Sequence, residues 1–182
     1  GRPSTLTGFT LIELLVVIFI SSLMLIGLFG LYSWHSKVYS YQQAVIGVTE
    51  QSRYVGDTLQ TYGTQAMQVL ASSTVDSIDY VSTTTTVILA LPVLDSNGSP
   101  QAGKQDIVVM YAENGKVYFK LRPDNSSSRK PITRLLSDSA QSFNLTYDFS
   151  DFDKIKTVSV DAKFSITSQS GTIVASDLEQ SV

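Results

Sequence analysis

The chain has 182 residues, 43% of them hydrophobic, and a formal net charge of -3 from 13 basic and 16 acidic side chains. This length suits one medium-sized folded domain plus one long apolar segment. The near balance of charge argues against a partner held by bulk electrostatic attraction, such as nucleic acid or anionic lipid. No cysteine is present, which excludes disulfides, thiolate nucleophiles and cysteine-ligated metals.

A long apolar run lies near the start of the chain. Residues 14–31 form 18 consecutive positions of which only Ser21, Ser22, Gly27 and Gly30 are not strongly apolar. At about 1.5 Å per residue, a helix of this length nearly crosses a ~30 Å hydrocarbon core. A cleaved secretory signal would have a shorter apolar region and a small-x-small cleavage site, and a buried helix of a soluble protein would show a polar face. The pattern favours a membrane-spanning helix.

Glu13 stands just inside the apolar region, where a carboxylate is costly unless it has a partner. The nearest basic residues along the chain are Arg2 and Lys37, and neither is close to Glu13. Cleavage between Gly8 and Phe9 would create a new α-amino group four residues before Glu13. Such an amine would supply the missing positive charge at the membrane interface.

The stretch GFTLIELLVV, residues 8–17, resembles the class III signal of type IV pilins and pseudopilins. The resemblance implies that residues 1–8 are a prepilin leader and that a prepilin peptidase cuts after Gly8 and methylates the amine of Phe9. It also implies that Glu13 pairs with the N-terminal amine of a neighbouring subunit during filament assembly. The alternative for Glu13 is an interfacial residue without a partner. One departure from the family pattern is that the leader has a single basic residue, Arg2.

The apolar run is followed by an amphipathic segment, residues 33–71, which contains no proline. We expect one helix from Phe9 to about Ala71, with residues 9–32 as the transmembrane and assembly part and residues 33–71 continuing into the globular domain. This segment contains three glycines, Gly47, Gly56 and Gly63. Each lowers the helix propensity of the segment and allows a bend there. The second half carries an apolar stripe at steps of three and four that is broken only by Ser52; its members are Val38, Tyr41, Val45, Val48, Val55, Leu59, Tyr62, Ala66 and Val69.

The remaining residues, 72–182, are rich in Ser, Thr, Val and Tyr and are typical of antiparallel strands. The strongest hairpin signal is Asn114-Gly115, between two alternating runs within residues 106–123. Two loops are expected, at residues 95–104 and 124–131. Six or seven strands are expected in all, the others at residues 83–94, 132–136, 142–149, 157–168 and 172–176. The predicted fold is α+β and pilin-like, with a long helix packed on an antiparallel β-sheet domain.

Residues 134–166 resemble J-type pseudopilins and W-type minor pilins, in which an extended sheet region follows the helix. This resemblance implies a structural subunit of a type IV pilus or a type II secretion pseudopilus. The implied partners are other pilin or pseudopilin subunits, the prepilin peptidase and the assembly platform in the membrane. The precursor would be a single-pass protein of the inner (cytoplasmic) membrane, and the mature chain would enter a periplasmic or cell-surface filament. The alternative is a pilus-tip adhesin or DNA-uptake receptor that uses the helix as an anchor.

No enzymatic activity is expected from the residues present. The single histidine, His35, lies beside Trp34 just after the apolar run, a position typical of the membrane interface. One histidine without cysteine cannot build a histidine-ligated zinc site, and a catalytic triad would have to use His35. A membrane-anchored hydrolase remains a third candidate, which would need a cleft with converging polar groups.

Three carboxylates in one short loop, Asp148, Asp151 and Asp153, are candidate calcium ligands. The loop lacks the glycine and the terminal glutamate of an EF-hand, and aspartate is also common in turns. We therefore expect no cofactor and retain calcium as the minor candidate.

A basic group flanks the second predicted loop, at Arg122, Arg129, Lys130 and Arg134. These side chains could contact DNA phosphates, but a solvated loop is the favoured interpretation. Nucleic acid is not an expected partner.

Overall fold

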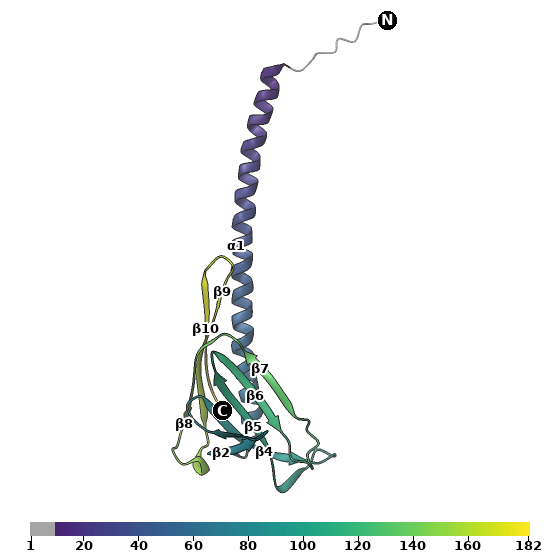
Figure 1. Cartoon of the computed structure of the whole chain (residues 1–182), viewed down its shortest axis with the longest axis vertical. Coiled ribbons are helices and arrows are strands. Elements are labelled where there is room, and N and C mark those ends of the chain that lie inside the picture. Colours follow the sequence, from purple (N-terminus) through teal and green to yellow (C-terminus); the bar gives the residue numbers. More distant parts are fainter. Residues whose placement is uncertain (1–9) are drawn as a thin grey trace.

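The computed structural model describes residues 10–182, except for the side chain of Asp153. Helix α1 (Leu11–Gly63) projects from a β-rich domain, and its first half stands clear of the sheets (Figure 1). The predicted α+β architecture, a long helix packed on antiparallel sheets, is confirmed. Ten strands follow α1 in the described part: β1 (Gln68–Val69), β2 (Ser72–Val75), β3 (Ile78–Val81), β4 (Thr86–Leu94), β5 (Pro100–Glu113), β6 (Lys116–Arg122), β7 (Ile132–Ser137), β8 (Ala140–Tyr147), β9 (Val158–Thr167) and β10 (Ile173–Ser181). A short 3₁₀ turn, η1 (Phe152–Lys154), precedes β9.

The strands form two antiparallel sheets and one separate hairpin. The larger sheet has the order β1-β4-β5-β6-β7, the smaller one has the order β10-β9-β8, and β2 pairs only with β3. The second half of α1 contacts β7 of the larger sheet and β9 and β10 of the smaller one. The hairpin of β9 and β10 runs upward along α1 toward the free half of the helix (Figure 1).

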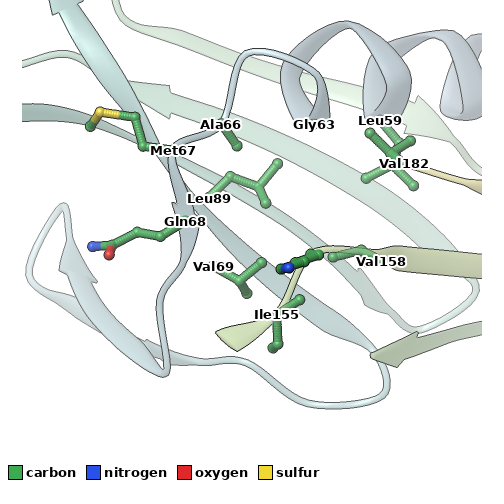
Figure 2. A pocket seen from close by; sticks show the side chains of 11 residues that line it. Leu59, Gly63, Ala66, Met67, Gln68, Val69, Leu89, Ile155, Val158 and Val182 are labelled. Atoms are coloured by element: carbon green, nitrogen blue, oxygen red, sulfur yellow. The ribbon is translucent and has the colours of Figure 1, made fainter. Parts of the chain in front are cut away.

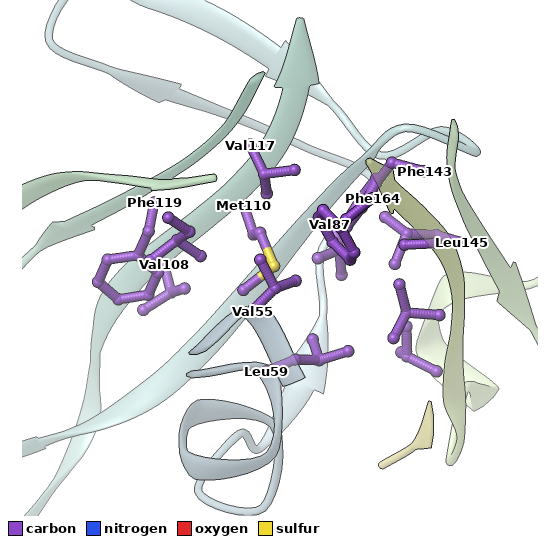
Figure 3. Close-up of a cluster of buried hydrophobic side chains, with 14 of the residues drawn as sticks. Val55, Leu59, Val87, Val108, Met110, Val117, Phe119, Phe143, Leu145 and Phe164 are labelled. Carbon is purple, nitrogen blue, oxygen red and sulfur yellow. The ribbon is translucent and has the colours of Figure 1, made fainter. Parts of the chain in front are cut away.

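The main core fills the space between α1 and the two sheets. The helix contributes Val48, Val55 and Leu59, all essentially inaccessible to solvent. The sheets contribute side chains that point toward the helix (Figure 3), among them Val87, Val108, Met110, Val117, Phe119, Phe143, Leu145 and Phe164. A smaller cluster joins Val75 of the β2–β3 hairpin to Ile88 and Val109 of the larger sheet, on the face away from the helix. Both faces of β4 are therefore covered.

The helix ends at Gly63, so the prediction that it continues to about Ala71 is wrong. The N–H of Thr64 still bonds to the carbonyl of Gln60, and the chain then turns. Val69 joins β1 opposite Leu89 and is buried there. Val69 has the spacing of the helical stripe, but packing in the sheet decides its conformation. At the other end of the stripe, Tyr41 stays 44% exposed, and Ala44 is the first helix residue that is buried.

The predicted strands are present, with shifted ends, but the β2–β3 hairpin was missed. The sequence of β2, SSTV, buries only Val75 and has no apolar alternation. The turn residues Asp76 and Ser77 both have positive φ (55° and 64°) without any glycine, so the usual hairpin signal is missing. The predicted Asn114-Gly115 turn, with φ of 51° and 74°, has that signal and joins β5 to β6. Strand β5 also begins at Pro100, inside the predicted loop.

Two glycines near the end of α1, Gly56 and Gly63, lie where the end of the chain packs against the helix. The helix continues without interruption through Gly27, Gly30, Gly47 and Gly56. A β-carbon on Gly56 would lie 2.5 Å from Oε1 of Gln180 and 3.1 Å from Cδ1 of Leu178. A β-carbon on Gly63 would collide with Val182. These glycines let β10 and the residue after it lie directly against the helix.

Candidate functional site

The start of α1 is closed by a reciprocal pair of hydrogen bonds between Thr10 and Glu13. Thr10 is the N-cap, with extended backbone angles (φ -77°, ψ 149°), and its hydroxyl oxygen accepts from the N–H of Glu13 at 3.4 Å. The Oε2 atom of Glu13 accepts from the N–H of Thr10 at 2.9 Å and from its hydroxyl at 3.0 Å. This is a capping box, which satisfies helix donors that would otherwise lack acceptors.

The capping box fixes the Glu13 carboxylate at the N-terminal end of the helix, where the helix dipole favours a negative charge. Both bonds from Thr10 end on Oε2, and Oε1 accepts no hydrogen bond from residues 10–182. Within the described residues, the capping box thus uses one of the two carboxylate oxygens of Glu13. The predicted cleavage site, Gly8-Phe9, lies outside the described residues. The part played by Thr10 was not predicted, although the Thr-x-x-Glu pattern of residues 10–13 would have indicated it.

The first half of α1 presents apolar side chains to the surroundings on every face. Leu11 is 83% exposed and Phe29 73% exposed, and the large apolar side chains between them are exposed too. Among the described residues, α1 is the only helix long and apolar enough to cross a membrane. An apolar surface this large requires lipid or neighbouring protein to cover it.

Aromatic and polar side chains follow the apolar surface on the same helix. Tyr32, Trp34 and His35 are all exposed, so none of them is part of the domain core. This arrangement fits the predicted interfacial position of His35.

The candidate calcium ligands take part in local contacts within their loop. Both carboxylate oxygens of Asp148 accept from the backbone N–H of Lys156, at 3.1 and 3.3 Å. Asp151 forms an ion pair with Lys154 at 2.9 Å. The carboxylate of Asp153 lies outside the described side chains. No group of three His, Cys, Asp or Glu that could hold a metal occurs among the described residues. Calcium binding stays a prediction.

Two of the basic residues proposed for phosphate contact are held by carboxylates of the domain. Arg122 donates from Nε and Nη2 to the two oxygens of Asp76, at 2.6 and 2.5 Å. This bidentate bond holds the pKa of Asp76 below its ordinary value. Arg129 donates to Oδ2 of the fully buried Asp106 at 2.8 Å and to the carbonyl of Pro92 at 2.6 Å.

The other two basic residues differ from each other. Arg134 donates to the hydroxyl of Tyr54 on α1 at 3.1 Å, which links β7 to the helix. Lys130 is exposed and pairs with no carboxylate of the described residues. Arg122 and Arg129 line one open hollow of about 740 Å³, but each guanidinium is bound to a carboxylate, so the four residues do not form a free basic surface.

A cavity of about 280 Å³ lies between the end of α1, β1 and the start of β9 (Figure 2). Most of its lining side chains are apolar, among them Leu59, Val69, Leu89, Val158 and Val182. The lining side chains that carry nitrogen or oxygen are Gln68 and Lys156. No nucleophile and base converge here, so this cavity offers no support for a hydrolase.

A family model described as the prokaryotic N-terminal methylation motif matches residues 7–29. The match covers the predicted cleavage site and Glu13 and continues through most of the apolar run. No curated protein and no solved structure matches the chain. The motif indicates a type IV pilin-like precursor that is processed by prepilin peptidase, and it suggests a structural subunit rather than an enzyme. The exposed apolar helix fits a membrane-anchored precursor that later enters a filament.

Proposed function

We propose that this protein is a minor pilin or pseudopilin, an assembly subunit of a type IV pilus or a type II secretion pseudopilus. One observation carries the proposal: the methylation motif lies at the head of an apolar helix that its own domain leaves uncovered. The function is assembly rather than catalysis. In the precursor, lipid covers residues 9–31, and in the filament the helices of neighbouring subunits replace the lipid.

Glu13 sets the register of this assembly. After cleavage behind Gly8, the methylated amine of one subunit enters the helical bundle and meets the Glu13 carboxylate of its neighbour. Oε1 of Glu13 is open to that donor, while the capping box holds the carboxylate at the end of the helix. An unpaired charge in such a low-dielectric environment costs several kcal/mol, about 3–5 when one partner of a buried pair is removed. Only an alignment that pairs the two charges avoids this cost.

The sheet domain lies at the other end of the helix and supplies outward-facing contacts to other subunits (Figure 1). A tip receptor for DNA, the alternative role, would need a free basic groove. Arg122 and Arg129 are bound to Asp76 and Asp106, and this favours the structural role.

The proposal is tested at the cleavage site. We expect the unchanged protein, isolated from membranes and filaments of the producing cell, to begin with N-methylated Phe9. Gly8→Ala should leave the leader attached, because the motif places the tightest protease subsite at this glycine. Gly27→Ala is the matched control, since a β-carbon there meets nothing within 4 Å in the monomer. Intact-mass and N-terminal peptide analysis decides: a mature Phe9 terminus in Gly8→Ala contradicts the proposal.

A further inference from the structure

The tip of the β9–β10 hairpin reaches the part of α1 that follows the apolar run (Figure 1). Between hairpin and helix lies an open groove of about 310 Å³. Its walls combine aromatic, hydroxyl, amide and ammonium groups, with Phe29, Tyr32, Ser36 and Lys37 from the helix and Gln169 and Ser170 from the hairpin. The polarity of the groove changes along the helix axis. Its helix wall begins with the aromatic residues Phe29 and Tyr32 and continues with serines and Lys37.

Lys37 gives the groove its only formal charge. It is the one formally charged residue between Glu13 and Glu50, and residues 164–176 of the hairpin contain none. Lys37 is exposed and forms no ion pair with a described carboxylate. Among the described residues, this end of the domain therefore presents a neutral surface with one cation, Lys37, that pairs with no carboxylate.

The groove lies at the level of the membrane surface when α1 spans a bilayer. Residues 14–31 cover ~27 Å as a helix, close to the ~30 Å thickness of the hydrocarbon core. Phe29 then lies at the end of the hydrocarbon, and Tyr32 and Lys37 lie among the headgroups. Trp34, 64% exposed, fits the same aromatic belt. A hairpin tip without charged side chains can lie at this depth without burying a charge.

We propose that the groove binds the phosphodiester headgroup of a phospholipid in the precursor, an inference that rests on the membrane anchoring in the proposed function. The ammonium of Lys37 pairs with the phosphate, and the hydroxyls of Ser33 and Ser36 donate hydrogen bonds to its oxygens. The Phe29 ring covers the first methylenes of an acyl chain. The attraction is local to Lys37, since the net charge of -3 gives no general pull toward anionic lipid. The bound headgroup would hold the sheet domain against the bilayer at a fixed height until assembly.

The absence of cysteine makes a site-specific test possible. A fluorophore is attached through Ser170→Cys at the hairpin tip or, as the control, through Ser96→Cys in the β4–β5 loop. The full-length chain is reconstituted in phosphatidylcholine–phosphatidylglycerol vesicles that contain lipid with a nitroxide on its headgroup. We expect strong quenching of the Ser170→Cys label and none of the Ser96→Cys label. Equal, weak quenching at both positions overturns the proposal.

The ammonium is tested by charge reversal on the Ser170→Cys background. Lys37→Glu should reduce the quenching toward the level of the Ser96→Cys control, because a carboxylate repels the phosphate. Lys130→Glu makes the same change of charge on an exposed lysine in the β6–β7 loop and should leave the quenching unchanged. Undiminished quenching in Lys37→Glu overturns the assignment of Lys37 as the phosphate ligand.

The single tryptophan, Trp34, separates this proposal from the one on which it rests. Acyl chains brominated near the headgroup should quench Trp34 when α1 is inserted in the bilayer. Unquenched Trp34 contradicts membrane anchoring itself. Quenched Trp34 together with an unquenched Ser170→Cys label overturns only the headgroup site.

Discussion

Gly63 of α1 and Val182 pack so closely that no β-carbon fits on Gly63. Val182 is fixed in place by two backbone hydrogen bonds to Val158, at 2.7 and 2.9 Å. Its branched side chain leaves little freedom to move aside. The close approach of these two residues ties the end of the helix to the smaller sheet.

We expect Gly63→Ala to lower the stability of the domain. Alanine favours a helix by about 1 kcal/mol over glycine, but overpacking costs typically about 1–3 kcal/mol and acts against β10 as well. Denaturant unfolding of the detergent-solubilised chain, followed by near-ultraviolet circular dichroism, measures the difference. Gly27→Ala should cause no loss, since its β-carbon meets nothing within 4 Å. A Gly63→Ala protein as stable as the unchanged chain contradicts the packing argument.

The loop between β6 and β7 is organised by the buried carboxylate of Asp106. This carboxylate accepts from the N–H of Asp124 at 2.9 Å, the hydroxyl of Ser127 at 2.8 Å and the guanidinium of Arg129 at 2.8 Å. Asp106→Ala should cost about 3–5 kcal/mol, because it leaves the largely buried guanidinium without a counter-charge. Chemical denaturation measures the loss.

The control for Asp106 is Lys104→Ala, which removes an exposed lysine that donates to the hydroxyl of Ser126 at 2.7 Å and lies 4.0 Å from Asp124 in the same region. Surface pairs of this kind contribute about 0–1 kcal/mol. Similar small losses in both variants would show that Asp106 does not organise the loop.

Because of Tyr147, we expect the free energy of unfolding of the domain to change with pH in the alkaline range. Its hydroxyl lies 2.9 Å from the carbonyls of Thr83 and Thr86, and burial raises the pKa of the phenol to about 12. The unfolded chain ionises near its ordinary pKa of about 10, so the stabilisation is complete below that pH and is lost as the pH rises toward 12. Equilibrium unfolding at a series of pH values should show this loss.

Tyr147→Phe lacks the ionising group. It should be less stable near neutrality by about 0.5–1.5 kcal/mol because it loses a hydrogen bond. Its stability should also fall less between pH 10 and 12 than that of the unchanged chain. Part of the fall remains, since burial also raises the pKa of Tyr111 to about 12. Identical pH profiles for the two proteins would contradict the role of Tyr147.

Strong local patterns made the helix and the β5–β6 hairpin predictable. The apolar run and the Asn114-Gly115 turn are each encoded within a few neighbouring residues. The end of the helix was not predictable from spacing, because Val69 is placed by its pairing with Leu89 in a distant strand. The β2–β3 hairpin depends on a turn without glycine and on Asp76, whose partner Arg122 is 46 residues away in sequence.

The residues of the candidate sites also differ in how far the sequence alone could predict their partners. Glu13 could be found because one carboxylate stands out at the start of an apolar run, and the pattern that identifies Thr10 as its capping partner is equally local. The partners of Arg122 and Arg129 are brought together only by the folded sheet, and so the sequence alone suggested a free basic loop.

In the proposed function, Glu13 serves filament assembly through its charge. Glu13→Leu should insert into the membrane at least as well as the unchanged chain, because it removes a residue that costs ~2.5–3.5 kcal/mol at a helix centre and less at the interface. Its entry into filaments should nevertheless drop. Glu13→Gln separates the two roles of the residue, because glutamine can still complete a capping box but carries no charge.

The most direct measurement is the amount of each variant, relative to the unchanged subunit, in sheared filaments from cells that express both. Quantitative mass spectrometry gives this ratio and also verifies that each variant begins at Phe9. We expect Glu13→Leu and Glu13→Gln to be strongly depleted from filaments while their amounts in the membrane stay normal. Filaments that contain correctly processed Glu13→Leu in the same proportion as the membrane would contradict this role of Glu13.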